Sequence, residues 1–380
     1  MFSLLTLKSA PTTTRRTYNV NNSDVNSLQD CTYLYKGMTI NEEVKSQFSQ
    51  LENCSNAYGL LADAVGDVTD TTSYEGQSYK IFDASLYLPN CENCHKLINS
   101  NTRIRNLDVT VKNMNDDIMD NPYLLSANIT ILSETPNVNY YCKGNSNLKT
   151  LSFNLSNGVS LAYYVSANNP NLQTFNFNAP LMKEYNYSTH NMFFMGDASI
   201  TELNCNLPSL IKGDYMFNGA SNLPTVSMDL PSLTSGKYMF SNCSSLRTFT
   251  GSLKNLTDAT YMFNNTGLEY FYTDDLSNLS ITDNMFNLCN LAPISIRLLA
   301  YLLPSNSSSK SIKLPIKLLY NNSQIIDNSN TSSTQAALTD FANQAGFSSW
   351  SELRNLFSQK NWSVSWCYGT TNTQLSGNYS

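Results

Sequence analysis

Short runs of alternating apolar and polar residues return at a fixed distance along the middle of the chain. Phenylalanines mark this distance, because five of them stand 23 residues apart: Phe194, Phe217, Phe240, Phe263 and Phe286. Four of the five directly follow a methionine. Equal spacing over four intervals indicates an internal repeat, and repeats of this length are typical of solenoids, propellers and arrays.

Each repeat also contains one short segment in which every second residue is apolar, as in Leu203-x-Cys205-x-Leu207. A period of two predicts a strand whose alternate side chains point to opposite faces. A single unit cannot bury its apolar face alone, so neighbouring units must stack and their strands pair in parallel. We therefore predict an α/β-type repeat solenoid of about nine 23-residue units with one parallel sheet, and Met-Phe pairs that fill its core.

The two ends of the chain do not keep this interval. Residues 1–70 are predicted to be an N-terminal arm and a degenerate cap, the cap over about 28–60, because an open solenoid end exposes apolar surface. The solenoid itself is predicted over 75–291. Residues 292–380 predict a small α+β element with helices over 296–303, over 335–345 and after Ser349, and strands over 312–319 and 362–366. This element is either a C-terminal cap or a docking element.

Composition narrows the classes of partner. Hydrophobic residues make up 41% of the chain and charged residues only 14%, with a net charge of −6. A core must therefore form, and its polar surface must consist of uncharged Asn, Ser and Thr. The acidic balance argues against nucleic acid as a partner, and no apolar run is long enough for membrane insertion. The first residues lack the leading positive charge of a secretory signal peptide, so none is expected.

Nine cysteines in 380 residues are too scattered for a disulfide scaffold, and we expect buried free thiols. The segment Cys91-Glu92-Asn93-Cys94-His95 matches the attachment motif of c-type haem and offers three metal-ligand side chains. Against a cofactor or metal, the only other histidine is His190, and the repeat aligns Cys91 with a core leucine. With only two histidines, the chain has few residues that could activate a nucleophile, so we expect no enzyme activity, catalytic residue, cofactor or metal. The alternative interpretation of the Cys91–His95 motif is that it binds haem or a metal.

Two segments carry a resemblance to a known family: Tyr238-Met239-Phe240-Ser241-Asn242-Cys243-Ser244-Ser245-Leu246 and Met285-Phe286-Asn287-Leu288-Cys289. They resemble the leucine-rich repeats of the BspA-like class of bacterial surface antigens and the related Met-Phe-x-x-Cys repeats of mycoplasma-type surface proteins. The resemblance covers a little over half of the chain. Similar repeats occur in adhesins and in structural proteins of bacteriophages that infect gut bacteria. The resemblance implies a leucine-rich-repeat array with a binding role and no catalytic residues.

If the apolar residues of each strand point inward, the alternate residues form an outward sheet face. That face is rich in hydroxyls and amides, which suit sugar or polar peptide ligands, and ends in tyrosines that offer stacking surfaces. The alternative is that these residues only solvate an exposed sheet. The candidate ligand-binding residues are Thr174, Asn176, Asn204, Asn206, Thr225, Ser227, Thr248, Thr250, Tyr270 and Tyr272.

These features lead to one functional hypothesis and one alternative. The hypothesis is a non-enzymatic leucine-rich-repeat protein of a bacteriophage virion, with a structural or host-surface-binding role. Its partners would be other virion proteins, or a protein or glycan of the host surface. The alternative is a secreted or cell-surface bacterial adhesin, located extracellularly or at the cell surface, that binds a host protein or glycan.

Overall fold

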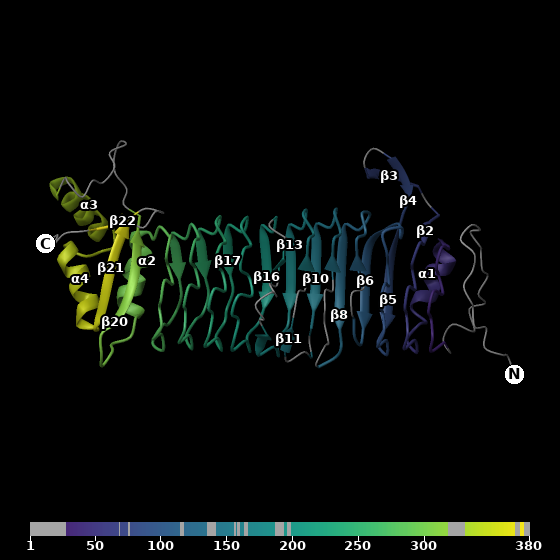
Figure 1. Cartoon of the computed structure of the whole chain (residues 1–380), viewed down its shortest axis with the longest axis horizontal. Helices are drawn as coiled ribbons and strands as arrows, with labels where there is room; N and C mark the ends of the chain where they lie inside the picture. The colour runs from purple at the N-terminus through teal and green to yellow at the C-terminus, as the bar shows by residue number, and fades with distance from the viewer. Residues whose placement is uncertain are drawn as a thin grey trace.

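The structure is a computed structural model that describes residues 28–67, 69–74, 77–114, 118–134, 142–155, 157, 160–162, 166–186, 194–195, 199–317, 331–368 and 373–375. These residues form an elongated β-solenoid, in which the chain winds from one end to the other and equivalent strands stack side by side (Figure 1). The predicted fold class, a repeat solenoid with parallel strands, is therefore confirmed.

One side of the solenoid, here called the strand face, consists of parallel strands in chain order. Six pair into a continuous sheet, and three more continue along the same side (Figure 1). The first sheet contains β5 (Phe82–Leu88), β6 (Ile104–Val111), β8 (Ser126–Ile131), β10 (Thr150–Asn154), β13 (Thr174–Asn178) and β16 (Glu202–Asn206), and the second contains β17 (Thr225–Ser227), β18 (Thr248–Thr250) and β19 (Tyr270–Tyr272). Leu151 pairs with Phe175, and Phe175 pairs with Leu203, the register that the apolar ladder predicts.

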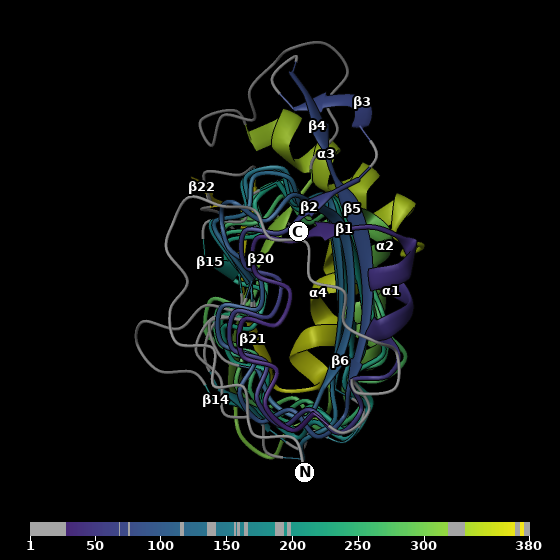
Figure 2. The same cartoon turned by 90° about the vertical axis from the view of Figure 1, so that its right-hand side faces the viewer.

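The chain returns along the opposite side of each coil through turns and short strands, as the view along the long axis shows (Figure 2). The short strands add parallel sheets beyond the one that was predicted. They are β7 (Ile118–Met119), β9 (Cys142–Lys143), β12 (Ser166–Ala167) and β15 (Phe194–Met195) in one sheet, and β11 (Ser160–Ala162) with β14 (Glu184–Asn186) in another. A further short parallel pair, β1 (Thr39–Ile40) with β2 (Val65–Gly66), lies near β5 at the N-terminal end (Figure 2). In the C-terminal half, turns stack instead, and Tyr215 N donates to the carbonyl of Lys237 over 2.8 Å.

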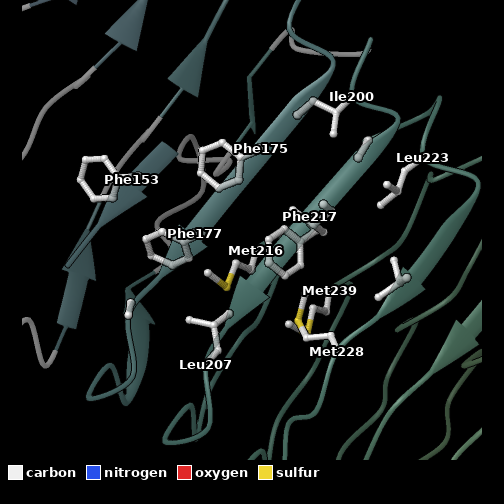
Figure 3. Close-up of a cluster of buried hydrophobic side chains, with 14 of the residues drawn as sticks. Phe153, Phe175, Phe177, Ile200, Leu207, Met216, Phe217, Leu223, Met228 and Met239 are labelled. Atoms are coloured by element: carbon white, nitrogen blue, oxygen red, sulfur yellow. The ribbon is translucent and has the colours of Figure 1, made fainter. Parts of the chain in front are cut away.

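The core lies between the strand face and the return side and contains the repeated Met-Phe pairs. Their eight side chains from Met216 to Phe286 are fully buried. The rings of Phe217, Phe240, Phe263 and Phe286 stack in a column with centroids 5.4, 5.6 and 5.9 Å apart. Figure 3 shows Phe217 and Met216 packed beside Phe175 and Phe177 of β13. The predicted core of Met-Phe pairs is confirmed there, with the rings stacked in a spine, whereas the side chain of Phe194 lies outside the described residues.

The stack already includes residues 28–66, ahead of the first predicted unit. Asp30 pairs with Asn56, which pairs with Asn93 of the next coil. Helix α1 (Glu42–Phe48) is capped by Asn41, whose side chain accepts a hydrogen bond from Val44 N, and it packs against β5 at the N-terminal end of the strand face. An antiparallel hairpin, β3 (Thr69–Tyr74) and β4 (Gln77–Lys80), projects from this end (Figure 1). The sequence reasoning anticipated neither α1 nor the hairpin.

The C-terminal end is closed by three helices and one three-stranded sheet of the described residues. They comprise α2 (Pro293–Leu302), β20 (Lys310–Ile316), α3 (Thr331–Gln344), α4 (Trp350–Gln359), β21 (Trp362–Tyr368) and β22 (Thr373–Gln374). Helix α2 covers the last strand, because Ser295 Oγ accepts from Phe271 N and donates to the carbonyl of Glu269. Strand β20 continues the return side by pairing with Leu291. The expected α+β elements are present with ends shifted by a few residues.

Candidate binding face

The outward side chains of the strand face are small and polar, because period-two alternation turns every second residue away from the core. On β13, Phe175 and Phe177 are buried while Thr174 and Asn176 are half-buried at the surface. On β16, Asn204 and Asn206 are exposed. Thr225, Ser227, Thr248, Thr250, Tyr270 and Tyr272 likewise lie on the outer side of β17, β18 and β19.

Asparagines on neighbouring strands hydrogen-bond to one another in two rows. The first amide column (Asn128, Ser152, Asn176 and Asn204) and the second amide column (Asn154, Asn178 and Asn206) each run across the strands. In the first, Asn204 Nδ2 donates to Asn176 Oδ1, and Asn176 Nδ2 donates to Ser152 Oγ, both over 2.9 Å. In the second, the Nδ2 atoms of Asn206 and Asn178 donate to the preceding Oδ1 atoms over 2.8 and 2.9 Å. In-register parallel pairing brings equivalent side chains about 4.8 Å apart, which allows these bonds.

A hollow of about 410 Å³ lies on the strand face between the two amide columns. Side chains of both columns line it, and the intervening strand residues Phe153, Phe177 and Cys205 complete the lining. The hollow spans β8, β10, β13 and β16, so its long direction follows the solenoid axis rather than a single strand. The structure thus gathers three of the predicted site residues, Asn176, Asn204 and Asn206, in one place.

The other predicted residues do not share this hollow. Thr225, Ser227, Thr248 and Thr250 form a plainer hydroxyl surface on β17 and β18. Beyond them, the rings of Tyr270 and Tyr272 are nearly parallel, at 11°, with centroids 6.3 Å apart. The candidate site is therefore an extended strip with an amide-lined hollow near one end and two tyrosines at the other.

Charges on the strip are few and locally paired. Glu202 accepts hydrogen bonds from Thr174 Oγ1 at 3.1 Å and from Asn204 Nδ2 at 3.0 Å. At the N-terminal end, Asp83 forms an ion pair with Arg105 over 2.7 Å. Partial burial raises the pKa of Asp83, but the hydrogen bonds from Arg105 and Asn106 outweigh burial and leave that pKa below its ordinary value.

In the Cys91–Cys94–His95 segment both cysteines enter the core, whereas His95 is half-buried. Cys91 is buried at the core position that the repeat alignment predicts for it, and Cys94 is buried as well. The His95 ring packs near that of Tyr58, with centroids 5.4 Å apart. All nine cysteines are free thiols and eight are buried, and within the described ranges no three His, Cys, Asp or Glu side chains gather as metal ligands would. The structure therefore gives this motif a packing role.

Two polar features of the structure were missed from the sequence. Tyr215, Tyr238 and Tyr261 stack on the return side with centroids 4.6 and 4.7 Å apart, and each has a positive φ, which is rare for a bulky residue. Their recurrence directly before three of the four Met-Phe pairs was the available signal. Inside the core, Asn145 Oδ1 accepts from Asn121 N, and Asn169 Oδ1 accepts from Asn145 N, forming a buried ladder.

Comparisons with known proteins leave the family open. No family model matches the chain, and no curated protein matches its sequence. Among solved structures, a leucine-rich repeat protein from Bacteroides ovatus matches with 13% identity and a TM-score of 0.18, over 77% of this chain and 82% of that one.

In the part of the chain that the structure describes, no helix is both long and apolar enough to cross a bilayer.

Proposed function

We propose that this chain is a non-enzymatic repeat protein that binds through its strand face, as a structural or host-surface-binding component of a bacteriophage virion. The observation that carries the proposal is the strip of outward amides, hydroxyls and tyrosines that follows the two sheets of the strand face. Repeat solenoids commonly recognise partners through such extended surfaces. The virion setting rests on the resemblance of the Met-Phe-x-x-Cys repeats to those of phage structural proteins.

The packing of the cysteines supports a non-catalytic role. Cys91 and Cys94 are the residues best suited by sequence to hold a cofactor, yet both fill the core between coils. Burial also raises the pKa of Cys243 and Cys289 to about 12, so these thiols stay protonated near neutral pH and are poor nucleophiles.

The proposed ligand surface comprises the residues that the sequence pointed to and the structure places outward. Asn176, Asn204 and Asn206 line the hollow, and Thr174 lies outside it on the same strand as Asn176. Thr225, Ser227, Thr248, Thr250, Tyr270 and Tyr272 extend the strip toward the C-terminal end. Either end of the solenoid could then hold the particle while the strip stays accessible.

Quantitative mass spectrometry of purified phage particles from the source culture tests this assignment. We expect the chain to co-purify at a fixed copy number relative to a capsid protein through successive density gradients. Recovery of the chain from cell surfaces or culture medium, with none in the particles, would contradict the virion assignment and favour the adhesin alternative.

A further inference from the structure

The amides of the hollow keep hydrogen-bonding capacity beyond the bonds they make to one another. A side-chain amide has two N–H donors and an oxygen with two lone pairs. Asn176 uses one donor toward Ser152 and one lone pair for Asn204. Asn178 uses one of each toward Asn154 and Asn206. Each of these two amides can therefore still offer one donor and one acceptor to a ligand.

The spacing of these groups selects the shape of that ligand. Along the solenoid axis the amides recur at the strand spacing of about 4.8 Å. An extended peptide presents groups on the same side only every two residues, about 6.6–6.8 Å, and so falls out of step within a few strands. A pyranose carries hydroxyls on both of its edges, so each ring of an extended chain can donate to and accept from the amides whichever way the ring is turned.

The charge of the strip selects against an anionic ligand. Glu202 lies at the edge of the hollow, while the hollow itself is lined by uncharged side chains. The mutual bonds within the columns also hold the amides in place before any ligand arrives, which lowers the entropy cost of binding.

From these observations we infer that the hollow binds a neutral, extended linear glycan laid along the solenoid axis, across β8, β10, β13 and β16. The glycan hydroxyls bond to the two amide columns. This inference rests on the proposed function, since it names the ligand class of the same strand face.

The length of the strip adds a second feature. Four strands span about 14 Å, whereas the six steps from β8 to β19 span about 29 Å at the ordinary strand spacing. A longer oligomer therefore reaches Tyr270 and Tyr272, whose rings can pack against a sugar ring. Affinity rises with oligomer length in two stages, first as the hollow fills and then as the tyrosines are reached.

Isothermal titration calorimetry on the intact chain tests the inference. The probes are linear β-1,4-linked gluco-, xylo-, manno- and N-acetylglucosamine oligosaccharides of two to eight rings, with dextran as a flexible neutral chain and alginate as a polyanion. We expect at least one β-1,4 series to bind with affinity that grows with length, and dextran and alginate to bind at least tenfold more weakly. No binding by any β-1,4 series, or equal binding by alginate, overturns the inference.

The paired variant Asn176→Ala/Asn178→Ala removes one amide from each column. Both sites are at the surface, so we expect the thermal midpoint to stay near that of the wild type. Glycan affinity should fall about tenfold for each amide lost, because a tenfold change corresponds to the free energy of about one hydrogen bond. The matched control is Asn255→Ala, which removes an exposed amide bonded to Pro231 in a turn outside the hollow. Unchanged glycan affinity in the paired variant overturns the assignment of the hollow.

A parallel cell-attachment assay separates this inference from the proposed function. If no glycan binds but the paired variant still loses attachment to cells that the wild type binds, the glycan inference fails and the strand face stands as the binding surface. If glycans do not bind and the paired variant attaches normally, both fail.

Discussion

Replacing Asn145 by alanine should destabilise the solenoid strongly, although the residue is a polar side chain of the kind usually found at surfaces. Asn145 is fully buried. Its Oδ1 accepts the backbone N–H of Asn121 over 3.0 Å, and its Nδ2 donates to the carbonyl of Ile118 over 3.1 Å. Alanine removes both partners and leaves a buried donor and a buried acceptor unsatisfied. Each such group costs about 1–3 kcal/mol, so the expected loss is about 2–6 kcal/mol.

The matched control is Asn147→Ala, two residues along the same turn. Asn147 is half-buried and donates a single hydrogen bond to the carbonyl of Pro122 over 2.7 Å. Water can replace that bond, so a loss of about 0.5–1.5 kcal/mol is expected. Equilibrium denaturation in guanidinium, followed by circular dichroism, compares both variants with the wild type. Equal losses, or a loss below about 1 kcal/mol for Asn145→Ala, would refute the reasoning.

A double-mutant cycle sharpens the assignment. The side chains of Asn145 and Asn169 share a hydrogen bond, because Asn145 Nδ2 donates to Asn169 Oδ1 over 3.2 Å. The losses caused by Asn145→Ala and Asn169→Ala should therefore not add in the double variant. Strict additivity would mean that the ladder does not couple neighbouring coils.

Four further outcomes follow from the structure. Phe240→Ala should cost about 3–5 kcal/mol in denaturation experiments, because it opens a cavity between the rings of its two neighbouring coils; unchanged stability would contradict the stacked spine. Replacing Tyr270 and Tyr272 by alanine should change stability by no more than about 1 kcal/mol yet weaken binding of the cognate target, and intact binding would exclude the tyrosines from the ligand surface. Cys243, whose pKa burial raises to about 12, should resist iodoacetamide at pH 8 until the chain is denatured, as peptide mass spectrometry can show; rapid labelling of the native protein would disagree. Because the pKa of Asp83 is lowered in the folded state, its ion pair stabilises the fold above the unfolded-state pKa of about 3.9, and this contribution is lost as the pH falls through the lower folded-state pKa. Asp83→Asn should therefore reduce stability at pH 7 and lessen the fall in melting temperature toward pH 2.5. Parallel profiles of melting temperature against pH for the variant and the wild type would contradict the contribution of the ion pair.

The repeating interval was enough to predict the register of the strand face. Once Leu151, Phe175 and Leu203 align by sequence, a one-residue slip would turn every apolar side chain to the outside, so only one pairing is compatible with a buried core. The Met-Phe pairs were predictable for the same reason, since a large apolar residue at a fixed place in each coil must stack on its equivalents.

Other features depend on interactions that leave no apolar pattern. Asn145 is polar, so no apolar pattern marks it as buried, yet its amide substitutes for backbone partners inside the turn. The hairpin of β3 and β4 contains mostly Thr, Ser and Asp, so hydrophobic alternation could not reveal it. Tyr238 adopts a backbone conformation that tyrosine rarely takes, offset by the stacking of its ring on both neighbours.

The candidate site was predictable only in outline. Alternation identified the outward positions, but the two amide columns arise from side chains that bond across strands, and the chosen residues omitted Asn154 and Asn178 of the second column. The hollow between the columns depends on which neighbouring positions carry asparagine and on how their amides bond. Predicting where the strands lie does not specify either of these.

The central claim, that the strand face is the binding surface, is tested most directly by attachment of the purified chain to cells that the wild type binds. A face variant, Asn204→Lys/Thr250→Lys, places two bulky cations on the strip without touching the core. A return-side variant, Ile281→Lys/Asp283→Lys, alters two exposed positions on the other side. The account predicts that attachment falls at least tenfold for the face variant and stays at the wild-type level for the return-side variant. Full attachment by the face variant, or loss confined to the return-side variant, would contradict it.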